Sequence, residues 1–300
     1  MKSSRRVGLI LVAMTVVVFV VSYALYQRAK AGSVELPNPN GYDQMRQTAL
    51  QIRNRLEDFE QLPDSHLEAY LNECERELTL LRQGLPLPSA VPVKFNTNWI
   101  TTQLPIMMGA RNLGHALAAE AELHKRRGNL DEAVQSALDL VRLGFVVGNR
   151  GLVIDFLVGT ACEIQGVRII TNSLEDLNLN QCKTVTEILE SMDMQRESPD
   201  SLFRREKRWA VATGGFLEYV KGIVEFKSLR PERSGPFDSQ GLVNTRLKDL
   251  RLIRMRIAAQ AFRLSNDRSP TNALELVPVF LKEAPVDPET SQPLTLEQAD

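Results

Sequence analysis

The sequence predicts an all-α protein: an N-terminal transmembrane helix, a bundle or irregular array of about eight antiparallel helices, and a short extended C-terminal tail. Three observations predict this fold class. Residues 7–26 form one apolar run without a charge. Beyond it, apolar residues recur at steps of three and four through most of the chain, which is the helical period. No stretch shows the sustained apolar–polar alternation that is typical of strands.

The apolar run is Val7–Tyr26, VGLILVAMTVVVFVVSYALY. As a helix it extends roughly 30 Å, the thickness of the hydrocarbon core of a bilayer. Residues 1–6 carry three cations and residues 27–41 carry two, and cations concentrate on the cytoplasmic side. We therefore expect a single-pass protein of the cytoplasmic (inner) membrane, with residues 1–6 inside, residues 27–41 as a tether and residues 42–300 outside the cytoplasm, in a periplasm-like space.

A cleaved signal peptide is the alternative interpretation of this run. Ala29-Lys30-Ala31 fits the small-x-small pattern of a cleavage site, with the cut after Ala31. The apolar part of a signal peptide usually has about 7–15 residues, fewer than this run contains, so its length favours an uncleaved anchor. Under either interpretation the rest of the chain is exported.

Charge and cysteine content exclude some classes of protein. The chain has 36 Lys and Arg against 37 Asp and Glu, a formal net charge of −1, so no basic excess indicates nucleic acid as a partner. Cys74, Cys162 and Cys182 are too few, and odd in number, for a disulfide framework. We expect buried thiols; if one pair forms, the candidate is Cys162 with Cys182.

The first two helices of the exported part form a predicted hairpin. Apolar residues at steps of three and four predict a helix over residues 42–59. Ser65 and Glu68 have the spacing of a capping box and open a second helix, and Gly84 stands where a helix ends. The short connection favours antiparallel packing of the two helices.

A proline-rich loop over residues 84–98 follows this hairpin. Loops of this length without regular structure are often functional, so we expect a lip over some surface. The next helix is predicted over residues 100–127, with Pro105 in its early turns, and another helix begins at Leu130. The concave side of these hairpins, near residues 113–143, and the loop are the predicted contact regions for a partner.

Residues 151–170 are the most hydrophobic stretch after the anchor. Asp155, Glu163 and Arg168 argue against a second transmembrane helix, because a charge costs about 3 kcal/mol at the centre of a bilayer. Small residues share one narrow face with Asp155 and would let a neighbouring helix approach closely; they are Gly151, Gly159, Cys162 and Gly166. We interpret this stretch as the central core helix.

The remaining elements each begin at a residue suited to start a helix. They are helices over residues 180–192, 199–229, 247–264 and 270–276, followed by an extended tail around residues 284–288. Asn180 caps the first of these helices, and Ser198-Pro199 opens the second. A division of the exported domain near residues 175–198 is left open.

One junction resembles a known repeat. Residues 128–133, GNLDEA, are similar to the turn between the two helices of a tetratricopeptide repeat. Gly128 would let the chain leave the first helix, and Ala133 would lie where the helices touch. Leu117 and Ala121 replace the usual Trp and Gly, and no second copy follows about 34 residues later. The resemblance implies one helical hairpin, not a repeat array.

Several features recur together along the whole chain. They are the anchor, NPNGYD at 38–43, the junction at 128–133 with Leu143-Gly144, residues 151–159 and the proline-containing stretch 270–294. In this combination the chain resembles a planctomycete family of single-span, exported, all-helical proteins to which no activity is assigned. The resemblance implies the topology and no chemistry. The last stretch also resembles the tail of type II secretion pseudopilins, but the anchor lacks their Gly-Glu start.

No catalytic signature occurs in the chain: it contains no G-x-S-x-G, no H-E-x-x-H, no phosphate-binding loop and no paired C-x-x-C. We expect no catalytic residue, no cofactor and no metal. Glu120 and His124 are four apart on one side of a helix, as zinc ligands can be, but an ordinary surface pair is the favoured interpretation.

Asp155 is the most suggestive single residue. A buried carboxylate needs a partner or a raised pKa, and we expect a structural hydrogen bond or an ion pair with Arg111 or Arg168. An acid or base role is the alternative, since perturbed carboxylates cluster at functional sites. Glu163 lies two turns further along the same helix and would contribute to such a pocket.

Cations gather in the last two long helices. The first group is Arg204, Arg205, Lys207 and Arg208, and the second is Arg246, Lys248, Arg251, Arg254 and Arg256. A solvated helix face is the favoured interpretation. Contact with anionic lipid headgroups through the second group is the next, because each cation near such a surface contributes about 1 kcal/mol.

These observations lead to three functional hypotheses. The first is a membrane-tethered scaffold of the cell envelope that binds a protein or peptide and has no catalytic activity. The second is a ligand-binding or hydrolytic domain that uses buried carboxylates around Asp155, which requires a polar pocket open to solvent. The third is a component of a secretion apparatus, which requires a strand-bearing C-terminal subdomain.

Overall fold

The structure is a computed structural model of the chain, and it describes residues 35–52, 56, 59–225 and 239–299. The predicted transmembrane run Val7–Tyr26 lies outside these residues. Within the described ranges, no helix is both long enough and apolar enough to cross a membrane. That finding agrees with the interpretation of residues 151–170 as a core helix.

Helices make up nearly all regular structure in the described part, which confirms the all-α class. The eight α-helices are α2 (Gly41–Gln51), α3 (Asp64–Gly84), α4 (Trp99–Arg126), α5 (Leu130–Gly148), α6 (Val153–Thr171), α7 (Leu179–Gln195), α8 (Pro199–Glu225) and α9 (Ser239–Asn266). Four 3-10 turns join them: η1 (Phe59–Gln61), η2 (Leu174–Asp176), η3 (Ala273–Leu276) and η4 (Leu296–Gln298).

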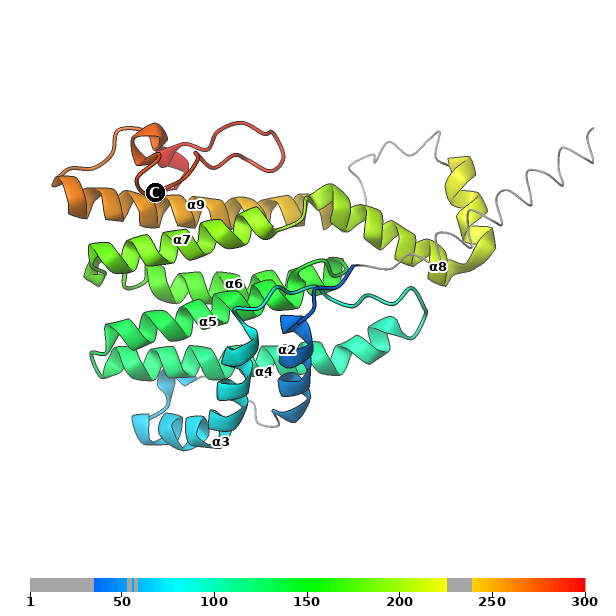
Figure 1. Cartoon of the computed structure of the whole chain (residues 1–300), viewed down its shortest axis with the longest axis horizontal. Coiled ribbons are helices and arrows are strands. Elements are labelled where there is room, and N and C mark those ends of the chain that lie inside the picture. Colours follow the sequence, from blue (N-terminus) through cyan, green and yellow to red (C-terminus); the bar gives the residue numbers. More distant parts are fainter. Residues whose placement is uncertain (1–34, 53–55, 57–58, 226–238, 300) are drawn as a thin grey trace, which may run out of the picture.

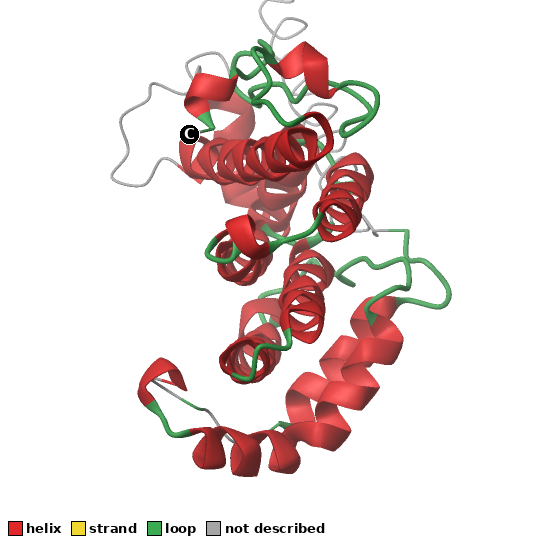
Figure 2. Cartoon of the chain, turned by 90° about the vertical axis from the view of Figure 1, so that its left-hand side faces the viewer, coloured by secondary structure: helices red, strands yellow, loops and turns green. Residues whose placement is uncertain are grey.

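The long helices lie in layers. Figure 1 shows α4, α5, α6, α7 and α9 running along the long axis of the molecule, while α2 and α3 pack across α4. Figure 2 shows the same layers nearly end-on, with α9 and the C-terminal tail on one side and α2 and α3 on the other. The tightly packed pair α5 and α6 lies in the middle of the stack, as predicted for a central core helix.

The predicted hairpin at residues 128–133 joins α4 to α5. Gly128 has φ +76°, a conformation that favours glycine, and it lets the chain turn directly after α4. Ala133 is 3% exposed in the first turn of α5. Both roles expected from the sequence are therefore confirmed.

Small residues let α5 and α6 approach closely. A Cβ placed on Gly166 would lie 2.7 Å from the carbonyl oxygen of Ala137, and one on Gly159 would lie 2.8 Å from the amide nitrogen of Gly148. Neither distance is compatible with a side chain, because protein interiors are close-packed. The small-residue face predicted for residues 151–170 is confirmed.

Two helix starts and one helix end differ from the prediction. Helix α2 ends at Gln51, and the apolar positions Leu56 and Phe59 pack on the core from outside a helix, so their spacing reflects burial alone. Helix α3 begins at Asp64, one residue before the predicted cap Ser65. Helix α7 is capped by the side chain of Asn178, not by Asn180.

The proline-rich loop is built into the core and does not form a lip. Its residues Ala90, Val91 and Val93 are almost fully buried. The amide nitrogen of Ala90 donates to Asn40 Oδ1 (3.0 Å), and Asn40 Nδ2 donates back to the carbonyl oxygen of Ala90 (2.9 Å). Asn149 holds the same segment through the carbonyl oxygen of Ser89 (2.7 Å). The chemistry of backbone hydrogen bonding thus outweighs the loop's length.

The C-terminal stretch is irregular, as predicted for a tail. The short helix expected over residues 270–276 is the 3-10 turn η3, which Asn272 caps. In residues 267–299 the only β pairing is one isolated bridge between Val286 and Pro293. The strand-bearing subdomain that the secretion-apparatus hypothesis requires is therefore not found in this described stretch.

All three cysteines are free and buried, as expected for structural thiols. Cys162 on α6 and Cys182 on α7 do not pair. Burial raises the pKa of the Cys162 thiol to about 12 and that of Cys182 to about 11. Both thiols are therefore protonated and unreactive at neutral pH.

Candidate functional site

Asp155 lies in the first turn of α6 and is fully buried. Its Oδ2 accepts a hydrogen bond from the backbone amide of Leu152 (2.8 Å), and its Oδ1 accepts one from Gln103 Nε2 (3.2 Å). The amide of Gln103 also donates to the hydroxyl oxygen of Tyr42, so one side chain joins α2, α4 and α6. The carboxylate therefore has a structural role at a helix N-terminus.

The predicted arginine partners of Asp155 are not the ones found. Gln103, a neutral side chain, takes the position expected for Arg111 or Arg168. Burial raises the pKa of Asp155 to about 6, and the hydrogen bonds from Leu152 and Gln103 oppose this rise. The carboxylate is thus poised near neutrality, but it is closed off from solvent on every side.

A second acid and a cation complete the surroundings of this helix start. Glu206 Oε2 accepts from the backbone amide of Val153 (2.9 Å). Arg205 Nε donates to the carbonyl oxygen of Gly151 (2.8 Å), and the same guanidinium pairs with Glu197. These three charged groups satisfy the backbone of the turn between α5 and α6, which is the requirement for burying a helix terminus.

Glu163 lies two turns further along α6 and forms a buried ion pair with Arg196. Arg196 Nη2 donates to Oε1 (2.9 Å) and Oε2 (2.7 Å) of Glu163. The side chains are 8% and 1% exposed. The guanidinium also lies over the rings of Phe145 and Phe156, 5.4 Å and 5.8 Å from the centroids. Burial raises the pKa of Glu163, and Arg196 counteracts this rise.

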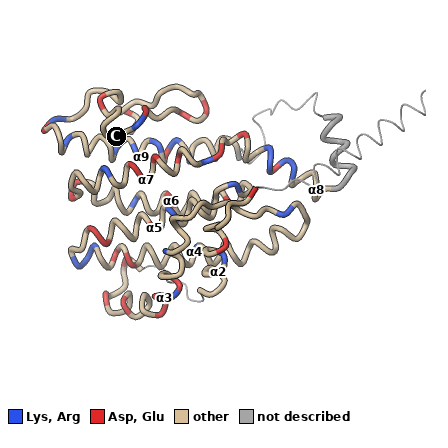
Figure 3. The backbone as a smooth tube through the Cα atoms, in the orientation of Figure 1, with Lys and Arg blue, Asp and Glu red and all other residues tan. Residues whose placement is uncertain are grey.

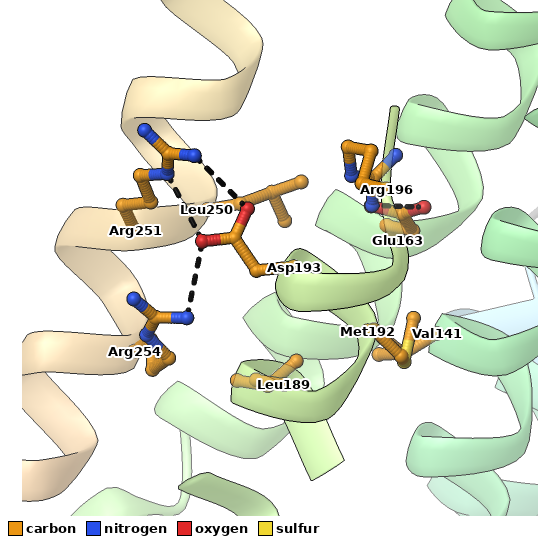
Figure 4. Close-up of a pocket in the computed structure, with 9 residues that line it drawn as sticks. All are labelled: Val141, Glu163, Leu189, Met192, Asp193, Arg196, Leu250, Arg251 and Arg254. Atoms are coloured by element: carbon orange, nitrogen blue, oxygen red, sulfur yellow. Dashed lines mark hydrogen bonds and ion pairs between the residues drawn. The ribbon is translucent and has the colours of Figure 1, made fainter. Parts of the chain in front are cut away.

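Asp193 on α7 binds two arginines of α9, as Figure 4 shows. Its Oδ2 accepts from Arg251 Nε (3.0 Å) and from Arg254 Nη1 (3.1 Å). Burial lowers the pKa of Arg254, and Asp193 opposes this effect. A cavity of about 20 Å³ lies between this trio and the pair of Glu163 with Arg196, which is room for one water molecule. The arrangement joins α6, α7 and α9 by charge.

Glu120 and His124 do not form the predicted surface pair. The carboxylate of Glu120 pairs instead with the guanidinium of Arg82 on α3 and accepts from Ser136 Oγ on α5 (2.7 Å). Arg82 Nε also donates to Asp139 Oδ2 (2.9 Å). His124 Nδ1 is buried without a hydrogen-bond partner. Tertiary contacts between α3, α4 and α5 therefore determine the partner of Glu120, not its spacing along one helix.

The cations predicted to form a solvated or lipid-binding face mostly have carboxylate partners. Arg246 pairs with Asp249 (3.6 Å) and Lys248 with Asp287 (2.8 Å), in addition to the two arginines that bind Asp193. Arg254 is 4% exposed. Arg256 is exposed and lines a polar hollow of about 520 Å³ beside the end of α6. This set does not form a free cationic surface.

Arg168 is exposed in the last turn of α6, apart from both buried acids of that helix. Among the described residues, no group of three or more His, Cys, Asp and Glu side chains comes together as a metal site would require. The predicted site residues are thus divided among separate structural networks. Asp155 and Glu163 share a helix, Glu120 lies in a third network, and no described contact joins His124 or Arg168 to them.

Sequence reasoning missed the residues that complete these networks. Gln103 interrupts an otherwise apolar face of α4, and such an interruption is a signal for a buried polar contact. Arg196 directly follows the end of α7, and Asp193 lies between two methionines. No spacing rule connects these residues to acids that are 33 or more positions away.

Comparisons with protein families, with curated proteins and with solved structures find no match for this chain. The class of the protein therefore follows from its own fold. It is a layered, all-helical domain whose described carboxylates at the core are neutralised by partners within the chain.

Proposed function

We propose that this chain is a non-enzymatic scaffold, tethered to the cytoplasmic membrane by Val7–Tyr26, whose helical domain presents a binding surface for a protein or peptide outside the cytoplasm. The observation that carries the proposal is the closure of the buried acids. Asp155 and Glu163 are at most 1% exposed, and each is bound by groups of the same chain.

The closed acids argue for structural roles over catalytic roles. A general acid or base has to come within hydrogen-bond reach of a substrate, and Asp155 has no path to one in this fold because it is completely buried. Buried ion pairs that join several helices are more useful for fixing one arrangement of those helices. A rigid stack of this kind suits a protein that positions other molecules.

The two contact regions predicted from the sequence supply little of the binding surface. The proline-rich loop is largely buried, and most residues between 113 and 143 belong to the core. The partner therefore binds elsewhere, on the exposed outer faces of the layers. The alternating charges of α3 and the exposed side of α4 are the surfaces that an experiment has to compare.

The membrane topology can be tested with single cysteines in intact cells. The three native cysteines are buried and should react slowly. Gln292→Cys in the exposed tail should react with a membrane-impermeant maleimide before lysis, and Ser4→Cys should react only after lysis. The opposite pattern, or a mature chain that begins at Gly32, would overturn the tethered topology.

The scaffold role can be tested by photocrosslinking in the same cells. A benzophenone amino acid is placed at one exposed residue of each outer face: Glu75 on α3, Leu104 on α4, Lys183 on α7 and Thr290 in the tail. A scaffold should give one discrete, light-dependent protein adduct from one face and none from the others. Failure of all positions to yield a protein adduct, with the topology intact, would rule out the scaffold role.

A further inference from the structure

The end of the molecule that receives the tether is defined by Glu35. Its carbonyl oxygen accepts from Arg150 Nη1 (3.4 Å), directly before the start of α6. From Tyr26 to Glu35 the chain makes nine residue steps, which extend at most about 30 Å. If Val7–Tyr26 spans the bilayer, the surface around Glu35 and Arg150 stays within that distance of the headgroups.

Large apolar side chains are exposed in a row at this same end. Ile100, Leu104 and Met108 are 38%, 55% and 62% exposed. They are four positions apart on α4 and therefore lie along one side of it. Figure 1 places the first half of α4 and the first described residues toward the same end of the molecule. Single exposed apolar residues are ordinary, whereas a contiguous row marks a contact surface.

The opposite side of the same helix segment is already committed to the core. Trp99 and Ile106 are 4% exposed, and Gln103 is 2% exposed. The first half of α4 therefore has two apolar sides, and only one of them has a partner within the described chain. Further exposed apolar residues lie near the tether at Leu36 (44%) and Ile154 (41%).

Charge around the row is one-sided. No Asp or Glu occurs between Glu77 and Glu120, although the chain has 37 of them. The exposed cations Lys94 and Arg111 lie before and after the row, and the first half of α4 shows no red in Figure 3. A surface with apolar residues, cations and no acids matches the headgroup region of an anionic bilayer.

We propose that the row Ile100, Leu104 and Met108 lies in the headgroup region of an anionic membrane, with Lys94 and Arg111 at lipid phosphates. This inference rests on the tethered topology proposed above and adds a second membrane contact to it. The short tether raises the local concentration of the row at the bilayer, so even a weak contact is sustained. The domain is then held in one orientation and does not swing freely.

The test uses the full chain in vesicles of phosphatidylcholine and phosphatidylglycerol, with an environment-sensitive fluorophore on one introduced cysteine. Val16→Cys reports on the anchor, Leu104→Cys on the row, and Leu274→Cys is the matched control. Leu274 is 73% exposed over α9, in the layer farthest from α4. The unsubstituted chain measures labelling of the buried native cysteines.

We expect lipids spin-labelled near the headgroup to quench the fluorophore at position 104 at least threefold more than at position 274. Quenching at position 104 should fall in vesicles of phosphatidylcholine alone. Lipids labelled deep in the acyl chain should quench position 16. If position 16 is quenched and position 104 behaves like position 274, the membrane contact is wrong while the anchor stands. If position 104 is quenched and position 16 is not, the contact stands and the anchor is wrong.

A pair of double variants separates this contact from other occupants of the row. With the fluorophore at Ile100→Cys, the change Leu104→Glu with Met108→Glu should abolish quenching, and Leu274→Glu with Val279→Glu should leave it unchanged. All four positions are more than half exposed, so the fold should tolerate the changes. A blue-shifted but unquenched fluorophore would show that protein, such as a second copy of the chain, covers the row, and would overturn the proposal.

Discussion

Gly144 on α5 and Gly159 on α6 lie backbone to backbone at the centre of the helix stack. A Cβ on either glycine would overlap the carbonyl oxygen of the other, and one on Gly159 would also lie 2.8 Å from the amide nitrogen of Gly148. The obstacle is backbone in each case, which cannot rotate away as a side chain can. The separation of α5 and α6 therefore depends on these two residues having no side chain.

Gly159→Ala should lower the free energy of unfolding by on the order of 2 kcal/mol. The clash pushes two core helices apart, which costs about 1–3 kcal/mol in well-packed interiors, and the higher helix propensity of alanine offsets only part of that cost. Thermal unfolding of the full chain in detergent, followed by circular dichroism, measures the change.

Gly114→Ala is the matched control for this substitution. Its Cβ would meet only side-chain atoms, Leu140 Cδ1 at 3.3 Å and Cys162 Sγ at 3.5 Å. These atoms can shift by a few tenths of an ångström, so the change in stability should stay within about 1 kcal/mol. Equal effects of the two substitutions would contradict the close approach of α5 to α6.

Removing one partner of the buried pair Glu163–Arg196 should be more damaging than removing both. Arg196→Met leaves the carboxylate of Glu163 buried without a counter-ion, which costs about 3–5 kcal/mol. The double variant with Glu163→Met leaves no unpaired charge, and methionine fills much of the same volume. It should be more stable than either single variant.

A double-mutant cycle measures this coupling. Free energies of unfolding for the parent chain, both single variants and the double variant should give an interaction free energy of about 2 kcal/mol or more. Arg246 with Asp249 is the exposed control pair, since both side chains are more than 40% exposed, and it should couple by less than about 1 kcal/mol. Additive single effects at Glu163 and Arg196 would show that the pair is not closed to water.

The raised pKa of Asp155 predicts a specific pH dependence. The folded carboxyl has a pKa of about 6 against 3.8 for its ordinary value, because burial disfavours its charged form. Between these pH values the folded chain binds the proton more tightly than the unfolded chain does, so stability falls as the pH rises from about 4 to about 6. The loss is on the order of 3 kcal/mol and is constant above that range.

Asp155→Asn removes this titration and keeps a carbonyl oxygen for the amide of Leu152. The stability of the variant relative to the parent should therefore rise as the pH increases from 4 to 7. Urea unfolding of both chains across this range gives the difference directly, because the other titrating groups cancel. A difference that is independent of pH would mean that Asp155 has solvent access in the folded state.

Local sequence patterns predicted the helices, and the small-residue face of α6 predicted its close neighbour. These features depend on residues within one or two turns of each other. The partners of the charged residues did not follow from the sequence, because they depend on how distant helices cross. Gln103 reaches Asp155 from 52 positions away, and Asp193 meets Arg254 from 61 positions away. Arginines that look like a solvated face in sequence are therefore neutralised by acids of other helices.

Burial of the proline-rich loop was missed for a similar reason. A loop buries its backbone only when another segment supplies hydrogen bonds, and here the side chains of Asn40 and Asn149 supply them from distant positions. Nothing within residues 84–98 announces those partners. The proline content correctly predicted the absence of a helix, while the side of the chain that the loop faces was set by the fold.

Asn40→Ala should release this loop without unfolding the stack. The substitution leaves the N–H and C=O of Ala90 without their partner, and each buried unsatisfied group costs about 1–3 kcal/mol. It also removes the cap of α2, because Asn40 Oδ1 accepts from the amide of Tyr42 (3.2 Å). Hydrogen–deuterium exchange should accelerate at least tenfold in peptides covering residues 85–95, while peptides of α5 should be unchanged.

Asn40→Asp separates the two halves of that contact. The aspartate keeps an oxygen for the amides of Ala90 and Tyr42, and it loses only the donor to the carbonyl oxygen of Ala90 (2.9 Å). Exchange in the loop should therefore lie between the parent chain and Asn40→Ala. If exchange in both variants matches the parent chain, then Asn149 and the apolar contacts of Val91 hold the loop on their own, and the proposed role of Asn40 as its clamp is wrong.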